Sequence, residues 1–468
     1  MRIERDSMGE MAVPDDALYG ASTQRAVLNF PISGRPMPPA FIHGLGLVKF
    51  ACARANTELE LLPESKGRLI ESAALEIATG KLDREFPVDV FQTGSGTSTN
   101  MNANEVIANR CSLASGRKIG SRDPVHPNDD VNLGQSSNDV IPTVLHVSVA
   151  VALKERLLPA LTQLHGELEA KASAWSGIVK IGRTHLMDAT PLTLGQEFSG
   201  YAAQVKKANG RIERAIDAIR ELAIGGTAVG TGINADPRFA PLVCRVLSER
   251  TGIEFREAAN HFEAQGARDD CVEVAGQLAA VAASLAKIAG DIRLLGSGPR
   301  SGIAEIKLPA TQPGSSIMPG KVNPVMSEML IQVCIYTQGL SSVVQACGRD
   351  GHFELNVTIP LIAHALHESI HCLSNGTAQF AKECVAEIEP DEARCRELVD
   401  RSLMLVTALN PLIGYDKAAE VAKRAHASGR TLREVVLEMK LLDAATLDKA
   451  LEPLGMTRPG ASGSASGG

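Results

Sequence analysis

The feature that most constrains the fold of this chain is a set of unusually long helical patterns in its middle. In one of them, apolar residues recur at alternating spacings of four and three, as in a bundle helix: Val274, Leu278, Val281, Leu285, Ile288, Ile292 and Leu295. A second stripe consists of Phe198, Tyr201, Val205, Ala208, Ile212, Ala215, Ile219 and Leu222. Three further long helices are predicted over Pro142–Trp175, Met329–Cys347 and Thr358–Ile388.

The length of these helices favours self-association. Roughly 25–30 residues is more than twice the usual ~11–12, and at ~1.5 Å per residue such a helix is about 40 Å long. One chain can hardly cover all faces of five such helices. Because aromatic residues make up only 3% of the sequence, Ala, Leu and Val must fill the core. We therefore predict a mainly α fold around a central five-helix bundle that associates with copies of itself.

Three domains are predicted around this bundle. Residues 1–135 mix shorter helices with Pro- and Gly-rich connections, and residues 136–388 hold the bundle. Residues 389–468 form a small helical domain, for which Asp391 has the character of an N-cap. We expect its last residues, ASGSASGG, to be a flexible tail.

The composition excludes several classes of protein. A net charge of −7 argues against a nucleic-acid partner. We do not expect the charged N-terminus to be a signal peptide. The most apolar helical pattern, residues 278–295, carries Lys287, Asp291 and Arg293, which excludes a membrane span. Nine scattered Cys residues without a C-x-x-C pair indicate reduced thiols, so we expect a cytoplasmic protein.

Four polar, Gly-rich segments carry the candidate chemistry: Thr93–Glu105, His126–Asp139, Gly182–Pro191 and Gly314–Pro324. Besides Lys321 and His185, they supply neutral hydroxyl and amide donors, namely Ser95, Thr97, Asn100, Ser136, Ser137, Asn138, Thr184 and Asn323. Such donors, next to the amides of helix starts, suit a small carboxylate ligand. Helix capping explains any one segment equally well, but hardly all four.

Three other motifs compete with this interpretation. Residues 314–321 faintly suggest a phosphate-binding loop, but the spacing is one residue too long and Val322 stands where Ser or Thr is required. GSGTST and GTAVGTG do not match the dinucleotide fingerprint. His367–His371 matches H-E-x-x-H on a helix, a pattern found in zinc sites, but no third ligand is evident. We prefer a polar face of a bundle helix for this motif and predict no metal.

Taken together, the four segments resemble those of the fumarase/aspartase superfamily. GSSIMPGKVNP (residues 314–324) is similar to the signature loop of that superfamily, and TGSGTSTNMN, HPNDDVN, SSND and GRTHLMDATPLTLGQE to its other segments. The resemblance runs through nearly the whole chain, including FELNV and SLMLVTALNPLIGYDKAAEVAK. It implies a homotetramer with a twenty-helix core, in which three subunits contribute to each active site. A monomer would then be inactive.

Within the superfamily, four positions favour a class II fumarase over an aspartase. This chain has His185 where aspartases carry Gln, and Gly320 where they carry Ala. It also has Asp130 and Ser137 where aspartases tend to place His and Thr. An aspartate ammonia-lyase and a non-catalytic helical scaffold stay open as alternatives. Three residues depart from the fumarase pattern, outside the positions assigned to chemistry: Met187, His352 and Gly134.

The resemblance implies reversible hydration of fumarate to L-malate in the tricarboxylic acid cycle, without a cofactor. It assigns Ser316 as the base that removes the C3 proton of malate, and His185 as the partner of the leaving water. Lys321 and Asn323 contact the carboxylate that becomes an aci-carboxylate, and Glu328 is expected to pair with His185.

The remaining candidate residues belong to binding rather than to proton transfer. By the same resemblance, Thr97, Ser137 and Asn138 help to hold the C4 dicarboxylate. His126, Asn128 and Asp129 resemble a second dicarboxylate-binding segment near the active-site entrance of the family. Capping of a helix by Asn128 or Asp129 is an equally good interpretation of that segment.

Overall fold

The computed structural model describes residues 1–459 and is mainly α-helical, as predicted. The chain divides into two compact units. The first unit comprises Met1–Pro159, Ala208–Ala283 and Val333–Asn375, and the second comprises Ala160–Lys207, Ser284–Gln332 and the chain from Gly376 onward. The division into three domains at residues 135 and 388 stays a prediction. The predicted flexible tail lies outside the described residues.

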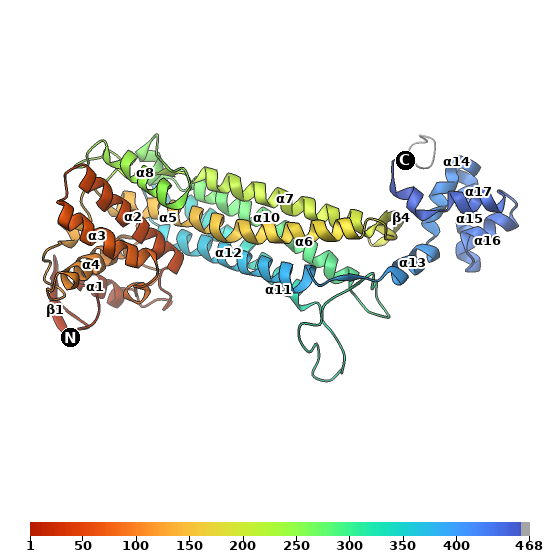
Figure 1. Cartoon of the computed structure of the whole chain (residues 1–468), viewed down its shortest axis with the longest axis horizontal. Coiled ribbons are helices and arrows are strands. Elements are labelled where there is room, and N and C mark those ends of the chain that lie inside the picture. The colour runs from red at the N-terminus through yellow and green to blue at the C-terminus, as the bar shows by residue number, and fades with distance from the viewer. Residues whose placement is uncertain (460–468) are drawn as a thin grey trace. The chain divides into compact units, whose positions relative to one another are not determined.

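Five long helical segments occupy the region for which the bundle is predicted (Figure 1). They are α5 (Ser137–Ala152) with α6 (Leu158–Ala174), joined by the π-helical turn η3 (Leu153–Leu157); α7 (Leu194–Ala218); α10 (Asp269–Leu295); α11 (Val325–Gly348); and α12 (Ile359–Phe380), which continues into η4 (Ala381–Val385). Every residue of the two predicted apolar stripes is buried, so the spacing rule identified the core-facing sides of α7 and α10. The stripe that begins at Phe198 was predicted too long as a helix, because α7 ends at Ala218 and Leu222 lies in β5 (Glu221–Leu222).

The first of these segments begins earlier than the prediction at Pro142. Ser136 and Asp139 form a capping box, in which Ser136 Oγ accepts from the backbone N–H of Asn138 and Asp139 Oδ1 accepts from that of Ser136. These bonds satisfy backbone donors that a helix start leaves without partners. The cap therefore fixes the start of α5 at Ser137.

The first unit also holds the N-terminal elements of the chain. They are β1 (Arg2–Asp6), β2 (Gly9–Val13), α1 (Ala21–Asn29), α2 (Pro39–Glu58), α3 (Glu64–Ala78), η1 (Asp83–Glu85), α4 (Thr97–Ala114) and η2 (Pro127–Val131). Later in the chain come β5 (Glu221–Leu222), α8 (Phe239–Thr251), β6 (Arg256–Glu257), α9 (His261–Gly266), β8 (Gly351–His352) and β9 (Leu355–Asn356). Helix α2 is central, because it packs against α3, α5 and α8.

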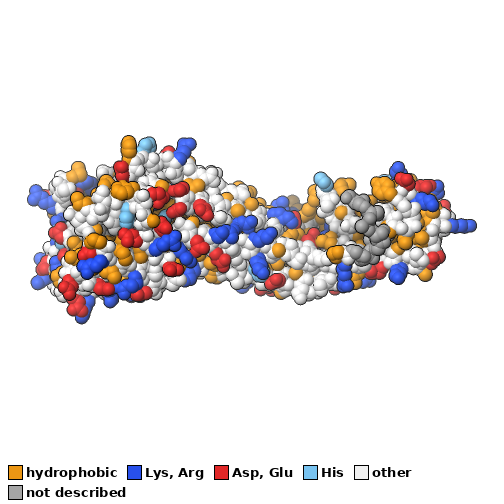
Figure 2. All heavy atoms as spheres, turned by 90° about the horizontal axis from the view of Figure 1, so that it is seen from above, with side chains coloured by type: hydrophobic (Ala, Val, Ile, Leu, Met, Phe, Trp, Pro, Cys, Tyr) orange, Lys and Arg blue, Asp and Glu red, His pale blue; other side chains and the backbone are white. Residues whose placement is uncertain are grey.

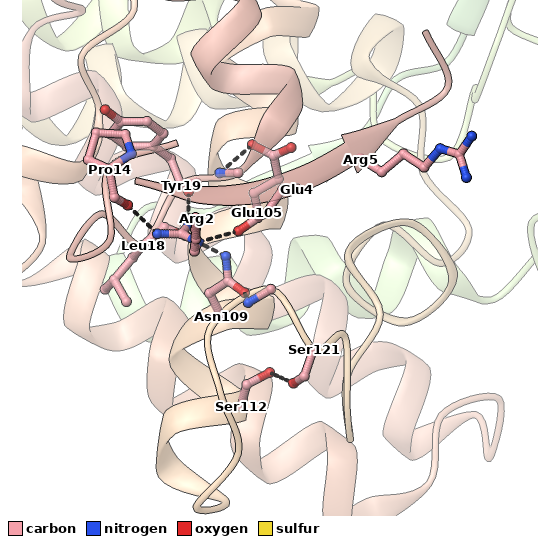
Figure 3. A network of polar contacts seen from close by, with 12 residues as sticks. Arg2, Glu4, Arg5, Pro14, Leu18, Tyr19, Glu105, Asn109, Ser112 and Ser121 are labelled. Atoms are coloured by element: carbon pink, nitrogen blue, oxygen red, sulfur yellow. Dashed lines mark hydrogen bonds and ion pairs between the residues drawn. The ribbon is translucent and has the colours of Figure 1, made fainter. Parts of the chain in front are cut away.

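A buried carboxylate on α4 anchors this unit. Glu105, which is labelled in Figure 3, accepts hydrogen bonds from the backbone N–H groups of Gly20, Ser22 and Thr23, so its charge caps the N-terminus of α1. One turn further along α4, the Asn109 amide donates to the carbonyl oxygen of Leu18 at 2.8 Å. A carboxylate at a helix N-terminus is favourable because it meets free N–H groups and the positive end of the helix dipole. These bonds hold α4, which carries candidate site residues at its own N-terminus.

The second unit contains a hairpin and the C-terminal helices. Its elements, besides the long helices, are β3 (Val179–Thr184), β4 (Met187–Thr193), β7 (Ile306–Lys307), β10 (Glu389–Pro390), α13 (Glu392–Arg401), η5 (Leu403–Leu409), α14 (Asn410–Ile413), α15 (Tyr415–Ser428), α16 (Leu432–Glu438), α17 (Ala444–Ala450) and η6 (Pro453–Thr457). Asp391 caps α13, as the sequence predicts, by accepting from Arg394 N. Ile181 of β3 belongs to the same apolar cluster as Val399, Leu409 and Val436. The C-terminal helices therefore support the hairpin.

The surface carries both signs of charge. On the face shown in Figure 2, basic and acidic side chains are interspersed over most of the area. Among residues 1–459, no helix combines the length and the apolar character that a membrane crossing requires.

The H-E-x-x-H motif lies on α12, and its two histidines have different surroundings. His367 is buried, with Nε2 2.8 Å from Ser148 Oγ, whereas His371 is exposed and lies next to Asn375. Within the described part of the chain, no three His, Cys, Asp or Glu side chains are arranged to hold a metal ion. Burial lowers the pKa of His367 from 6.5 to about 3, which marks it as a neutral core residue.

This buried imidazole makes stability depend on pH. Between about pH 6.5 and pH 3 the unfolded chain binds a proton at His367 that the folded chain does not, so the folded state loses stability as the pH falls. The wild-type protein loses stability between pH 7 and pH 5. In His367→Gln we expect this loss to be smaller, by up to about 2 kcal/mol. Urea unfolding at one protein concentration measures the difference. The exposed control His371→Gln should keep the wild-type loss, and an unchanged loss in His367→Gln would refute the assignment.

Candidate functional site

The N-termini of α4 and α5 bring the predicted donors of the first unit together. Gly96 adopts a φ of 74° just before α4, and a Cβ there would lie 2.7 Å from the side chain of Ile141 on α5. Glycine therefore allows the start of α4 to pack directly against α5. Ser95 Oγ and Thr97 Oγ1 are 2.9 Å apart at this junction. Two helix N-termini with hydroxyl side chains form a favourable place for an anion.

The amide side chains at this junction are held in fixed orientations. Asn100 is 1% exposed, and its Nδ2 donates to Ser137 Oγ at 3.1 Å and to Asn132 Oδ1 at 3.2 Å. Asn138 Nδ2 donates to the carbonyl oxygen of Ala228 at 2.8 Å. Ser136 serves as the N-cap of α5. The structure thus gathers all six donors that the sequence places around these two helix starts.

The segment with His126, Asn128 and Asp129 forms a separate polar corner of the first unit. His126 is itself the cap of η2, because its Nδ1 accepts from the backbone N–H groups of Asn128 and Asp129. The alternative in which Asn128 or Asp129 caps a helix is therefore wrong. Both of their side chains are exposed. Asp130 accepts a hydrogen bond from the backbone N–H of His126 and forms an ion pair with Lys66 of α3 at 2.8 Å. These contacts hold the segment against α3.

His185 lies at the tip of the β3–β4 hairpin in the second unit. Thr184 pairs with Met187, which leaves His185 and Leu186 as a two-residue turn with φ values of 56° and 62°. Such a turn suits the twist of a hairpin but requires positive φ at both positions, which residues other than glycine adopt at a cost. Thr184, His185 and the neighbouring side chains are exposed. The turn therefore presents the imidazole outward.

A buried ionic network supports this hairpin. Glu305 is fully buried and accepts two hydrogen bonds from the guanidinium of Arg183, at 2.9 and 3.0 Å. Lys180, 1% exposed, lies 3.2 Å from Glu305 and 3.0 Å from Glu197 of α7. A bidentate Arg–carboxylate pair fixes both distance and angle. Glu305 therefore connects β3 to the segment that leads from α10 toward residues 314–324.

The signature loop is closed at its base by its own side chains. Asn323 Nδ2 donates to the carbonyl oxygen of Gly314 at 2.6 Å, and a Cβ at Gly314 would lie 2.1 Å from the carbonyl oxygen of Lys321. Only glycine permits so close an approach of the two ends. Ser315 Oγ accepts from the backbone N–H groups of Ile317 and Met318. Ser316 and Lys321 are exposed on this loop, whose two ends are held together.

The predicted site residues fall into two sets. The first unit holds Ser95, Thr97, Asn100, His126, Asn128, Asp129, Ser136, Ser137 and Asn138, and the second holds Thr184, His185, Ser316, Lys321, Asn323 and Glu328. Glu328 lies in the first turn of α11, where its N–H bonds to the carbonyl oxygen of Pro324. The ion pairs within residues 1–459 do not include one between His185 and Glu328, so that pairing stays a prediction.

Sequence reasoning did not identify the buried charges behind these segments. Lys49 and Glu305 were not among the predicted site residues, although both are almost completely buried. A signal for Lys49 exists, since it stands among apolar residues in GLGLVKFACA, a pattern that places it on a buried face. Glu305 precedes a two-residue strand in an irregular segment, so no periodicity marks it. Gly134, a departure from the fumarase pattern, adopts a φ of 70°, which glycine accommodates.

Comparison with known proteins gives full-length matches. The sequence matches the family described as Lyase over residues 9–339 and the family described as Fumarase C C-terminus over residues 405–458. It is 50% identical over 459 residues to a class II fumarate hydratase of Xylella fastidiosa, covering 98% of this chain and 96% of the relative. For the Thermosynechococcus vestitus enzyme the identity is 51% over 448 residues, covering 96% of each. The structure of a class II fumarase from Schistosoma mansoni has a TM-score of 0.94 and 39% identity, over 98% of this chain and 99% of that chain.

The network around Glu305 yields a prediction about stability. Glu305→Gln leaves Lys180 and Arg183 without their shared carboxylate, and breaking a buried ion pair typically costs about 3–5 kcal/mol. We expect a lower unfolding midpoint and faster proteolysis of the β3–β4 hairpin. A matched change at an exposed pair, Glu397→Gln, should leave the unfolding midpoint nearly unchanged, because solvent screens such pairs. Equal midpoints for the two variants would contradict a supporting role for Glu305.

Proposed function

Because the chain belongs to the class II fumarate hydratase family, we propose that it interconverts fumarate and L-malate, as in the tricarboxylic acid cycle, through the residues described above. The observation that carries this proposal is agreement with enzymes of that activity along almost the entire chain. The matched length includes the β3–β4 hairpin, the N-termini of α4 and α5 and the loop of residues 314–324. No observation favours an ammonia-lyase or a non-catalytic scaffold.

We assign binding of the dicarboxylate to the neutral donors. Thr97, Ser137 and Asn138 surround the N-termini of α4 and α5, where helix ends favour an anion. Ser95, Asn100, Ser136 and Thr184 complete this set. Asn323 uses one amide N–H for Gly314, and an amide carries a second N–H that is able to face substrate. The corner formed by His126, Asn128 and Asp129 is assigned to a second dicarboxylate contact.

The chemistry needs one base, one acid and strong stabilisation of negative charge. Ser316 Oγ, held as an alkoxide or close to one, takes the C3 proton of malate. The electron pair of that C–H bond moves into the neighbouring carboxyl group, where Lys321 and Asn323 stabilise the dianion. Fixed donors of this kind are worth about 3–4 kcal/mol each.

The second step expels water. His185 gives a proton to the C2 hydroxyl, the C2–O bond breaks, and the electron pair of the aci-carboxylate forms the C2–C3 double bond. Glu328 is assigned as the partner of His185 in this step. Proton transfer of this type typically contributes 10²–10⁴-fold to the rate.

We propose that active sites are assembled from three subunits of a homotetramer with a twenty-helix core. Support comes from apolar side chains that a single chain leaves exposed on α11, where Ile335 is 63% and Tyr336 44% exposed. The exposure of His185 and Ser316 also fits sites completed by other subunits. We place the enzyme in the cytoplasm, with which its nine free cysteines are consistent.

The first experiment measures ultraviolet absorbance of the conjugated double bond after addition of malate to purified, EDTA-treated protein. We expect the absorbance to rise, and the rate to be the same with and without EDTA, because the assigned residues carry out the reaction without a metal. Parallel additions of aspartate and argininosuccinate serve as controls. A rise with aspartate would move the chain to the ammonia-lyases, and no rise with any substrate would favour the scaffold.

A second experiment tests the base and the shared site together. Ser316→Ala should lower kcat by at least about 10³-fold, because the base is lost, while size-exclusion chromatography still reports a tetramer. The variant Ser137→Ala is also expected to be impaired. If the two residues belong to different subunits of each site, refolding both variants together should restore part of the activity. A full-rate Ser316→Ala enzyme would refute the base assignment, and failure to complement would count against shared sites.

A further inference from the structure

A buried lysine lies behind the donors at the start of α4 and α5. Lys49, in the middle of α2, is 1% exposed. Its Nζ donates to Asn132 Oδ1 at 3.1 Å and to Gln135 Oε1 at 2.9 Å. Within the described residues its ammonium group forms no ion pair with a carboxylate, so neutral amide oxygens hold the charge. A buried charge that no carboxylate contacts is unfavourable for stability, which points to a use in function.

The lysine is connected to the candidate site through one amide oxygen. Asn132 Oδ1 accepts from Lys49 Nζ and also from Nδ2 of Asn100 and of Asn104, each at 3.2 Å. Asn132 Nδ2 donates in turn to the carbonyl oxygen of Gln135. Because an ammonium group only donates, it requires that Asn132 present its oxygen to this cluster. Asn100 is thereby oriented with its Nδ2 also on Ser137 Oγ, at 3.1 Å.

We propose that Lys49 is a positioning residue for the dicarboxylate site, which acts through Asn132 on Asn100 and Ser137 and places a positive charge behind the donors that hold the substrate. This inference rests on the proposed function, because it takes the bound anion to be a C4 dicarboxylate. The charge attracts both ground state and transition state, since both are anionic. Loss of Lys49 therefore affects KM more than kcat.

The charge on Lys49 depends on pH near neutrality. Burial lowers the pKa of its ammonium group from 10.5 to about 8. Two titratable groups lie near it, Cys52 on α2 and Asp139 on α5. Burial raises the pKa of the Cys52 thiol, so it stays neutral, and raises that of Asp139 to about 6, so Asp139 stays ionised above pH 7. In the neighbouring segment, Asp130 is paired with Lys66.

The sign of the effect follows from these charges. Of the three coupled groups, Lys49 is the one that titrates between pH 7 and pH 9, and it loses its positive charge as the pH rises through about 8. The affinity for a dianion falls with that charge. We expect the KM of the wild-type enzyme for malate to rise about tenfold from pH 7 to pH 9.

Two substitutions and one control separate charge from packing. Lys49→Met removes the charge and the donors, so we expect KM at pH 7 to be raised about tenfold, kcat to change less than about threefold, and KM to be flat up to pH 9. Lys49→Arg keeps a charge at every pH, and should restore a low KM without a rise through pH 8. Lys154→Met is the matched control. Like Lys49, Lys154 donates its Nζ hydrogen bonds to neutral oxygens, in this case the backbone carbonyl oxygens of Thr251 and Gly252.

A measurement on the unaltered enzyme covers the case in which the Lys49 variants fold poorly. Succinate, a saturated C4 dicarboxylate that cannot add water, is titrated into the wild-type enzyme at pH 8 in two buffers of different ionisation enthalpy. A bound dianion raises the pKa of Lys49, so calorimetry should report uptake of up to about half a proton per site. Lys154→Met should show the same uptake.

The outcomes separate this inference from the proposed function. Absence of malate turnover in the wild-type enzyme would overturn the proposed function itself. Turnover with a KM that is flat through pH 8, or succinate binding without proton uptake, would overturn the role of Lys49 alone. A folded Lys49→Met enzyme with wild-type KM at pH 7 would do the same.

Discussion

The apolar seams of the long helices are the constraint on which the rest of the structure depends. From Val274 to Leu295 every seam position of α10 is apolar and buried, and α7 follows the same rule. Such a seam is filled by apolar side chains, so the candidate site residues lie outside it. Backbone N–H groups at helix starts lack partners within the helix and are available there. Three of the four polar segments accordingly lie at, or immediately before, the starts of α4, α5 and α11, and the fourth forms the β3–β4 hairpin that precedes α7.

Polar helix ends need internal support, and buried charges supply it in two different ways. Glu305 is compensated, because Arg183 and Lys180 share its carboxylate, and such a network mainly fixes geometry. Glu105 is likewise satisfied by backbone N–H groups at the start of α1. Lys49 differs from both, since neutral amides hold its ammonium group and the neighbouring carboxylate, Asp139, forms no ion pair with it. Its charge is therefore only partly offset, and it acts over a longer distance on an anion bound at Asn100 and Ser137.

How regular a feature is along the sequence explains whether it could be predicted from the sequence. The buried residues of both stripes were predicted one by one, because burial along a helix has a fixed period, although the stripe that begins at Phe198 runs past the end of α7 at Ala218. The donors at the α4–α5 junction were found because hydroxyls and amides beside glycine are visible as a pattern. The start of α5 was misplaced at Pro142, because the capping box at Ser136 and Asp139 is a stronger signal than a proline. The cap of η2 by His126 was missed, since imidazole is not among the usual capping residues.

The buried charges were missed for a physical reason that separates local from long-range structure. Asn132 lies 83 residues from Lys49 in sequence, and Glu305 lies 122 residues from Arg183. Periodicity reports which face of a helix is buried but not which partner it meets there. A lysine in an apolar stretch such as GLGLVKFACA therefore signals a conflict between charge and burial without naming its resolution. Because burying an unpaired charge is unfavourable, such a conflict in the middle of an apolar helix is itself a pointer to function.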